Sequence, residues 1–493
     1  MFVIQASRVQ TILSSNRTLS AVAVFTFVLF LIGNLPWQLD DYDQAKQAYT
    51  SFEMIKEGRW FYQQTPHERV ATKPPLVGWI SAGLFAITRS WEVSWRLPSF
   101  LAAIALAFLL LRTASSAYGA IAGLVALSAF GLNLLSPRLA TLVRTDMPLA
   151  FVIFLIGVLT WRKIKKQQEW KLPDRVYLFA LLTIAMLIKG PIVYAFLLPG
   201  IGAFEWWHRQ YIARDCSHGA WVGWWPWLAS LAVFLLWVVG GILLQRGFFD
   251  EVVMREFLGR FGETIHRPQP LYFYLPHLVH KFAPWSVLLI AIAIFALASR
   301  RWKIGTAFRE MSPDTFWLLC WSLGGLVVMS LIPSKRVDRI FPVIPPLCLL
   351  LAAQVGRDGA ARRHYLWLAA ALLASIFFAG GYTIWKVATG YRDQRDALAI
   401  FGRDIRRETE RRHWRYEVVS AKDEGLLLYL RKTHYIEPDY AVAEWNGGNL
   451  NALVVSAEKA TRLMPQLRGA NVSRLKSMER TKEQSTAYVF VTR

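Results

Sequence analysis

Long apolar runs without charges constrain this chain more than any other feature of its sequence. They lie at roughly 19–36, 97–111, 119–136, 147–161, 176–188, 191–206, 225–244, 285–298, 315–332, 340–355 and 365–387. A hydrocarbon core of about 30 Å requires about 20 apolar residues in a helix, and several runs approach that length. The chain is also 54% hydrophobic over 493 residues. The sequence therefore predicts a mostly α-helical, polytopic membrane protein with about 11 spans (range about 11–13).

The charge and the cysteine content of the chain narrow the possible classes of protein further. A net charge of +22 would suggest nucleic acid as the partner of a soluble chain. Here the basic residues mostly punctuate the apolar runs, so the positive-inside rule and anionic membrane lipids explain them better, and no nucleic-acid partner is expected. Only Cys216, Cys320 and Cys348 occur, with neither zinc-type spacing nor a disulfide framework.

Basic clusters set the expected topology. Four of them each follow an apolar run, at 161–171, 208–214, 300–303 and 356–364. Placing all four in the cytoplasm puts the N-terminus there too. This assignment of loops to the two membrane faces holds only if the apolar run that begins at Pro75 does not cross the membrane. We therefore expect that run to form a re-entrant helix or a helix lying along the outer face of the membrane.

Two loops and the C-terminal tail then lie on the outer face. The loops are 37–96 and 246–283, within a membrane domain expected over 1–388. After Ala388 the composition turns charged and mixed, with a helical stretch "RDALAIFGRDIRRETERR" and short β-rich stretches "YEVVSA", "NALVVSA" and "YVFVTR". We expect residues 389–493 to form a small extracytoplasmic α/β domain.

Two carboxylates near the outer boundary are candidate catalytic groups, because ionisable residues at membrane depth are costly and usually functional. Asp43 stands at the start of an amphipathic helix in the first loop, and Asp146 follows Arg144 and precedes a proline that opens a span. Structural alternatives exist for both. An acidic residue favours a helix N-terminus, and Asp followed by Pro is a common helix start.

Cations recur at the same boundary. Lys73 precedes two prolines, Lys189 lies in "IKGPIVY", and Lys335 and Arg336 lie in "IPSKRVDRIF". Together they suggest a bound anion such as a lipid phosphate, whereas each alone could snorkel to head groups. The 246–283 loop carries His266, His277 and His280, which could bind a divalent metal or be structural.

These motifs, in this order, resemble the integral-membrane glycosyltransferases of the GT-C class. The likeness is closest to the bacterial lipid A aminoarabinose transferases and the protein O-mannosyltransferases. It covers about residues 20–350 and rests on the following stretches: "DQAKQAYTSFEMIKEGRW", "KPPLVGW", "WRLPS", "RTDMPLAF", "IKGPIVYAFLLP", "HRPQPLYFYLP" and "IPSKRVDRIFPVIPP". The chain departs from the family at Gln44 (family Glu), Lys46 (Arg), Gln47 (Tyr) and Thr72 (Glu in the aminoarabinose transferases).

The resemblance implies transfer of a sugar from a polyprenyl-phosphate donor to a lipid, glycan or protein acceptor, with inversion. The reaction would take place at the outer face of a bacterial inner membrane. In the family, two aspartates line the active site and a lysine binds the phosphate of the donor. The resemblance assigns Asp43 and Asp146 to the two acidic positions and Lys73 to the phosphate-binding position. No cofactor is expected other than a divalent metal in the region of His266. The remaining candidates for binding the donor phosphate are cations: Lys46, Arg144, Lys189, Lys335 and Arg336.

Two other classes share parts of this pattern. A transporter or flippase for a lipid-linked sugar also needs outward cations and a hydrophobic groove. Transporters, however, tend to carry inverted repeats and ionisable residues near mid-span, which the apolar runs lack. A lipid-binding scaffold with a recruiting C-terminal domain is the third alternative.

Overall fold

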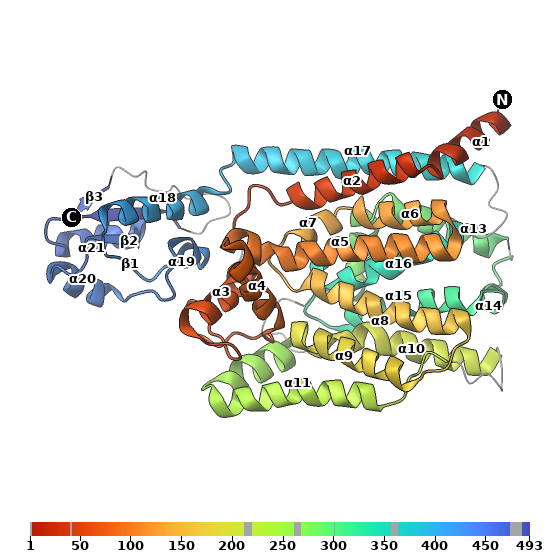
Figure 1. Ribbon diagram of the computed structural model, residues 1–493, viewed down its shortest axis with the longest axis horizontal. Helices are drawn as coiled ribbons and strands as arrows, with labels where there is room; N and C mark the ends of the chain where they lie inside the picture. The colour runs from red at the N-terminus through yellow and green to blue at the C-terminus, as the bar shows by residue number, and fades with distance from the viewer. Residues whose placement is uncertain are drawn as a thin grey trace. The chain divides into compact units, whose positions relative to one another are not determined.

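A computed structural model describes residues 2–39, 42–211, 219–260, 268–299, 301–355, 363–473 and 486–493. The chain is mostly helical and divides into two compact units (Figure 1). The first comprises Met1–Gly33 and Leu97–Ile384, and the second comprises Asn34–Arg96 and Trp385–Arg493. Helices α5 and α17 each contribute residues to both units.

The first unit is a helical bundle. Its α-helices are α1 (Phe2–Leu13), α2 (Asn16–Ile32), α5 (Trp91–Tyr118), α6 (Ala120–Gly131), α7 (Ser136–Ala140), α8 (Asp146–Lys166), α9 (Leu172–Lys189), α10 (Ile192–Tyr211), α11 (Trp225–Leu244), α12 (Tyr274–Lys281), α13 (Trp285–Ala298), α14 (Ile304–Arg309), α15 (Pro313–Leu331), α16 (Ile344–Val355) and α17 (Arg363–Arg392). A π-helix and three 3₁₀ turns complete it: η1 (Phe249–Phe257), η2 (Leu258–Arg260), η3 (Leu271–Phe273) and η4 (Val337–Val343).

Six helices in the described residues are long and apolar enough to cross a membrane, or seven if the bent pair 271–281 and 285–298 is one span. The two halves of that pair meet at 108°. Four shorter apolar helices, of 10–17 residues, accompany them. A chain with this many apolar helices is a polytopic membrane protein, as the sequence predicts. The expected total of about 11 spans stays a prediction.

Glycines let α10 and α15 approach closely. A Cβ on Gly200 would lie 2.8 Å from Trp321 Cα and 2.9 Å from the Cys320 carbonyl oxygen. A Cβ on Gly324 would lie 2.5 Å from the Gly200 nitrogen. Because only glycine fits at these two positions, the backbones pack against one another directly, as small residues allow in membrane bundles.

The apolar run 119–136 does not form one continuous helix. Helix α6 ends at Gly131, and the Asn133 amide nitrogen donates to the carbonyls of Ala129 and Phe130 at 2.8 and 2.7 Å. The Asn133 side-chain oxygen then accepts the backbone N–H groups of Leu135 and Ser136 at 2.8 and 2.9 Å. One buried amide therefore ends α6 and starts α7 by pairing the free backbone groups at both ends.

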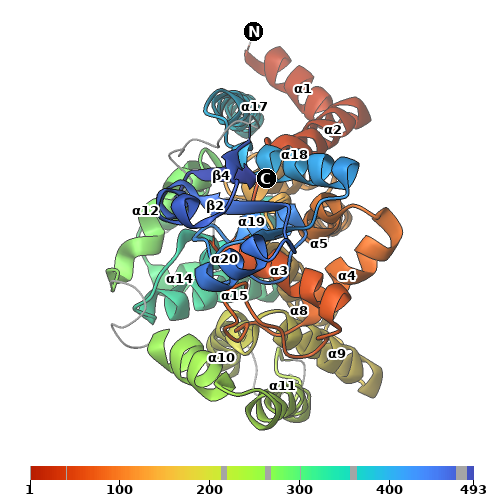
Figure 2. The ribbon, with the colours of Figure 1, turned by 90° about the vertical axis from the view of Figure 1, so that its left-hand side faces the viewer.

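The second unit combines two N-terminal helices with an α/β segment. Its elements are α3 (Tyr42–Glu57), α4 (Leu76–Thr88), α18 (Ala397–Arg412), β1 (Tyr416–Val418), α19 (Gly425–Leu430), α20 (Pro438–Asn446), β2 (Ala452–Ser456), α21 (Ala457–Leu463), η5 (Met464–Gln466), β3 (Asn471–Val472) and β4 (Tyr488–Thr492). Figure 2 shows the strands with α18 and α20 beside them.

The four strands form one sheet in the order β1-β2-β4-β3. Strand β1 pairs in parallel with β2, whereas β2–β4 and β3–β4 are antiparallel. A parallel pair needs a crossover, and α19 and α20 supply it. Strand β2 is buried at every position, and Trp445 of α20 packs with Leu453 and Val455 in the core.

Candidate functional site

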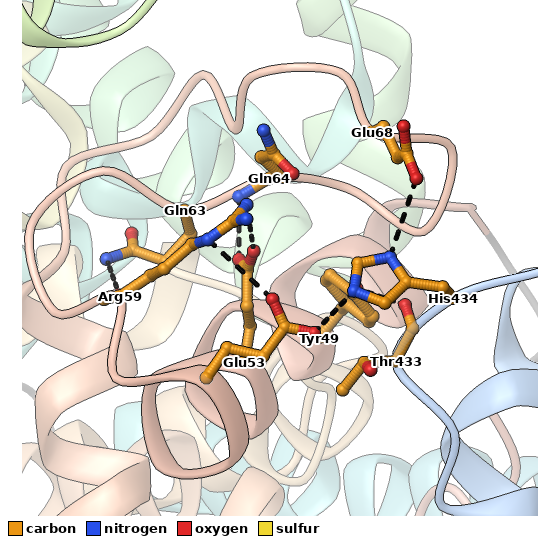
Figure 3. Close-up of polar contacts among 9 residues, drawn as sticks. Tyr49, Glu53, Arg59, Gln63, Gln64, Glu68, Thr433 and His434 are labelled. Atoms are coloured by element: carbon orange, nitrogen blue, oxygen red, sulfur yellow. Dashed lines mark hydrogen bonds and ion pairs between the residues drawn. The ribbon is translucent and has the colours of Figure 1, made fainter.

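Helix α3 carries a buried acidic group at its C-terminal end (Figure 3). The Glu53 side chain is completely buried. Its carboxylate accepts a hydrogen bond from Arg59 Nη1 at 3.1 Å and from the Gln64 backbone N–H at 2.6 Å. Burial raises the pKa of Glu53 to about 7, although the Gln64 N–H and the Arg59 guanidinium favour the charged form. These bonds hold the segment that follows α3, at Arg59 and Gln64, against the helix.

The same helix is fastened to the segment after α19. The Tyr49 hydroxyl donates to the Thr433 carbonyl, and His434 lies between two carboxylates, as Figure 3 shows. Its Nε2 is 2.6 Å from Glu57 and its Nδ1 is 3.6 Å from Glu68. Residues 49–68 and 433–434 therefore form one polar network within the second unit.

The predicted first-loop acid, Asp43, lies in the first turn of α3 and is half-buried. Lys46, one turn later, donates a long hydrogen bond of 3.4 Å to Thr72 Oγ1, next to the predicted phosphate ligand Lys73. The contact joins the motif at 43–60 to the motif at 73–79. Two stretches that the sequence singled out separately therefore meet at Lys46.

Glu424 completes this group and was not found from the sequence. Its side chain is 3% exposed, and Oε1 is 3.5 Å from His67 Nε2. Its Oε2 has no hydrogen-bond partner among the described residues. Burial raises the pKa of Glu424 to about 8; Lys46 and Arg69 oppose this rise and Asp43 adds to it. A carboxyl group that holds its proton near neutrality thus stands in the electrostatic field of Asp43 and Lys46.

Lys73 is half-buried and is followed by Pro74, Pro75 and the start of α4. Among the residues that the structure describes, no carboxylate lies within ion-pair distance of its ammonium group. The N-terminus of α4 adds partial positive charge close in sequence. Helix α4 has 13 residues, about 20 Å at 1.5 Å per residue, which is less than a membrane core requires. That this run does not cross stays a prediction.

In the first unit, the predicted acid Asp146 is paired with the predicted cation Lys189. The Lys189 ammonium donates to Asp146 Oδ1, and the two side chains are 11% and 8% exposed, respectively. Asp146 begins α8 and Lys189 ends α9, which places each charge at the helix end that favours it. The pair is therefore an internal salt bridge at the junction of two helices.

A second buried pair lies near it in the sequence. Arg144 Nη1 donates to Asp338 Oδ2 at 2.9 Å, with both side chains less than 10% exposed. Arg138 is 3.6 Å from Asp338 Oδ1 and is 42% exposed. The Ser99 hydroxyl bonds to the carbonyls of Leu142 and Arg144 at 2.8 and 3.1 Å, respectively. Asp338 lies within the motif "IPSKRVDRIF" but was not among the predicted site residues. It neutralises Arg144, a predicted phosphate ligand.

Lys335 joins two further motifs. Its ammonium donates to the Gln269 carbonyl at 2.8 Å, and the Gln269 N–H donates to the Pro333 carbonyl at 3.1 Å. Gln269 and the segment Pro333–Lys335 are therefore adjacent in the first unit. Arg336, next to Lys335, directly precedes the turn η4 and is half-buried.

A metal site finds no support in the described part of the chain. No group of three His, Cys, Asp or Glu side chains there is arranged to hold a metal ion. His277 instead packs its ring 4.7 Å from the ring of Phe273. His266 lies outside the described residues. The described residues therefore do not fit a metal ion.

The chain is similar to known membrane glycosyltransferases in sequence. Residues 72–239 match the family model described as dolichyl-phosphate-mannose-protein mannosyltransferase. An undecaprenyl phosphate-alpha-4-amino-4-deoxy-L-arabinose arabinosyl transferase of Sodalis glossinidius is 27% identical, covering 69% of this chain and 58% of that protein. The protein of the same name from Shewanella sediminis is 25% identical, covering 67% and 58%. The chain thus spans a little under three fifths of the length of these relatives.

Solved structures share the fold. The crystal structure of ArnT from Cupriavidus metallidurans bound to undecaprenyl phosphate aligns with a TM-score of 0.64 at 18% identity, covering 96% of each chain. The apo state of the same protein aligns with a TM-score of 0.60 at 19% identity, covering 96% of this chain and 97% of that one. The resemblance to GT-C glycosyltransferases of this kind, predicted from the sequence, is confirmed.

Proposed function

We propose that this protein is a glycosyltransferase of the bacterial inner membrane that uses a polyprenyl-phosphate sugar as donor. One observation carries the proposal. Relatives that match over two thirds of the chain are named as undecaprenyl phosphate aminoarabinose transferases. The fold of the chain is also that of ArnT, which was solved with undecaprenyl phosphate bound. The acceptor is a lipid, a glycan or a protein hydroxyl or phosphate group on the outer side, where residues 389–493 would also lie.

Lys73 is the proposed ligand of the donor phosphate. It is half-buried, has no carboxylate partner among the described residues, and is followed by the N-terminus of α4. A half-buried cation that is not neutralised by a carboxylate stabilises the negative charge that develops on the leaving phosphate. Arg144 and Lys189 are already neutralised by carboxylates, so we assign them to holding the fold around Asp146, in place of direct phosphate binding.

Asp43 is the proposed general base. The acceptor oxygen attacks the anomeric carbon, the bond from that carbon to the phosphate oxygen breaks, and polyprenyl phosphate leaves with the bonding electrons. The acceptor proton passes to the Asp43 carboxylate. A single displacement of this kind inverts the anomeric centre.

The test is a transfer assay with the full chain in lipid nanodiscs. A panel of polyprenyl-phosphate sugars is supplied with lipid A, a glycan and a peptide acceptor, and products are identified by mass spectrometry. We expect one donor–acceptor pair to give a product whose mass has increased by one sugar, with equimolar release of polyprenyl phosphate. Transbilayer movement of the intact donor without any product, measured with the same chain in sealed liposomes, would favour a flippase and contradict the proposal.

A further inference from the structure

A polar groove of about 940 Å³ opens on the α/β segment of the second unit. It is lined by the start of β1, the segment that precedes α20, and α20 itself. Its volume is within the range of small-ligand sites, about 300–1,000 Å³. His434 is one of the lining residues, and its ion pairs with Glu57 and Glu68 connect it to residues 49–68. None of the proposed transferase residues Asp43, Lys73 or Asp146 lines this groove.

Aromatic rings and planar polar groups both line the groove. Tyr440 is 57% exposed and belongs to α20, and Glu444 follows one turn later on the same face of that helix. Asn449 lies beyond the helix end. Tyr416, on the strand side, has its hydroxyl bonded to the Leu430 carbonyl at 2.6 Å. An exposed ring next to carboxylate and amide groups offers both an apolar platform and hydrogen-bond partners.

The charges in the groove cancel, although the whole chain carries +22. Arg415 and Lys432 are balanced by Glu417 and Glu444, and Lys432 is 2.9 Å from Glu417. The Lys432 ammonium also lies 4.6 Å from the centre of the Tyr416 ring, which holds it in place. A groove with no net charge gives little attraction to a polyanion such as a lipid phosphate or a nucleic acid.

The backbone of β1 is not open to an extended peptide. The Ile436 N–H donates to the Val418 carbonyl at 2.9 Å, and the Ser420 N–H donates to the Ile436 carbonyl at 3.1 Å. These bonds occupy the outer edge at the end of β1 that a peptide strand would need for pairing. Recognition in the groove must therefore rely on side chains.

We propose that this groove binds a neutral saccharide, whose apolar ring face stacks on Tyr440 while its hydroxyls bond to Glu444 and Asn449. Sugars combine an apolar ring face with many hydroxyl groups, which matches an exposed aromatic ring in a groove that also carries carboxylate and amide groups. The inference stands apart from the proposed transferase activity, because it uses other residues and predicts binding without turnover.

The test is saturation-transfer NMR and calorimetry on the full chain in lipid nanodiscs, because maltoside detergents are themselves saccharides. The probes are maltohexaose, cellohexaose and chitohexaose, with a heparin hexasaccharide as the polyanionic comparison. We expect at least one neutral probe to bind, and Tyr440→Ala to weaken it about tenfold, the loss of about 1.4 kcal/mol expected when a stacked ring is removed.

Two matched variants make the result specific. Tyr440→Phe keeps the ring and should bind as the wild type does, and Tyr391→Ala removes a ring that is 53% exposed outside the groove and should change nothing. Circular dichroism of Tyr440→Ala should match the wild type, because Tyr440 is on the surface. The inference is overturned if no neutral probe binds, if heparin binds more tightly than they do, or if Tyr440→Ala binds like Tyr391→Ala.

Discussion

Replacing Asp338 by Asn should destabilise the first unit strongly. Asp338 neutralises Arg144 at 2.9 Å, and both side chains are less than 10% exposed. Without the carboxylate, the buried Arg144 guanidinium loses the counter-charge that Asp338 supplies. Breaking a buried pair from one side typically costs about 3–5 kcal/mol. The free energy of unfolding, measured by titrating dodecyl sulfate into mixed micelles and following circular dichroism, should fall by that amount.

Two further variants separate the buried pair from its exposed neighbour. Arg138→Met removes a cation that is 42% exposed and 3.6 Å from the same carboxylate; such exposed pairs contribute about 0.2–1 kcal/mol. The double variant Arg144→Met with Asp338→Leu removes both buried charges and should recover most of the lost stability. A loss below about 1 kcal/mol for Asp338→Asn, or a double variant less stable than Asp338→Asn alone, would refute the reasoning.

Two other predictions concern packing and pH. Gly324→Ala should lower the unfolding free energy by about 1–3 kcal/mol, because its Cβ would lie 2.5 Å from the Gly200 nitrogen. Gly202→Ala is the control and should not lower it, because a Cβ there would meet no atom within 4 Å. Equal stabilities of the two variants would contradict the close packing of α10 and α15. Because the pKa of Glu424 is raised from 4.5 to about 8, the folded state binds more protons than the unfolded state between these values. Its contribution to stability is therefore full below pH 4.5 and lost as the pH rises to about 8. Glu424→Gln should flatten this loss, and an unchanged pH profile of thermal unfolding would contradict the assignment.

Patterns local in sequence predicted most of the elements. Apolar runs coincide with helices such as α8, α11 and α15, because burial in a membrane requires length and hydropathy that can be read directly. The stretches "YEVVSA", "NALVVSA" and "YVFVTR" contain β1, β2 and β4. The break after Gly131 was not foreseen, because the run continues to read as apolar and the cause is a single amide, Asn133, that bonds both helix ends.

The candidate site was predictable only in part. Asp43, Lys73 and Asp146 stand out because charges next to apolar runs are rare. Their partners could not be foreseen: the Arg144–Asp338 contact joins residues 194 apart. Glu424 lies in ordinary charged sequence, and only its burial beside His67 distinguishes it. Pairing of this kind depends on which helices become neighbours in the fold. A single sequence does not specify those neighbours.

The central claim is tested most directly by the turnover of Asp43→Asn and Lys73→Ala with the donor and acceptor found in the nanodisc assay. If Asp43 takes the acceptor proton and Lys73 stabilises the leaving phosphate, the base contributes about 10²–10⁴-fold and the cation about 10²–10³-fold. Each variant should therefore lose at least about a hundredfold in kcat, while Lys56→Ala, which removes a lysine from the last turn of the same helix α3, keeps wild-type turnover. Full activity in both Asp43→Asn and Lys73→Ala would contradict the account.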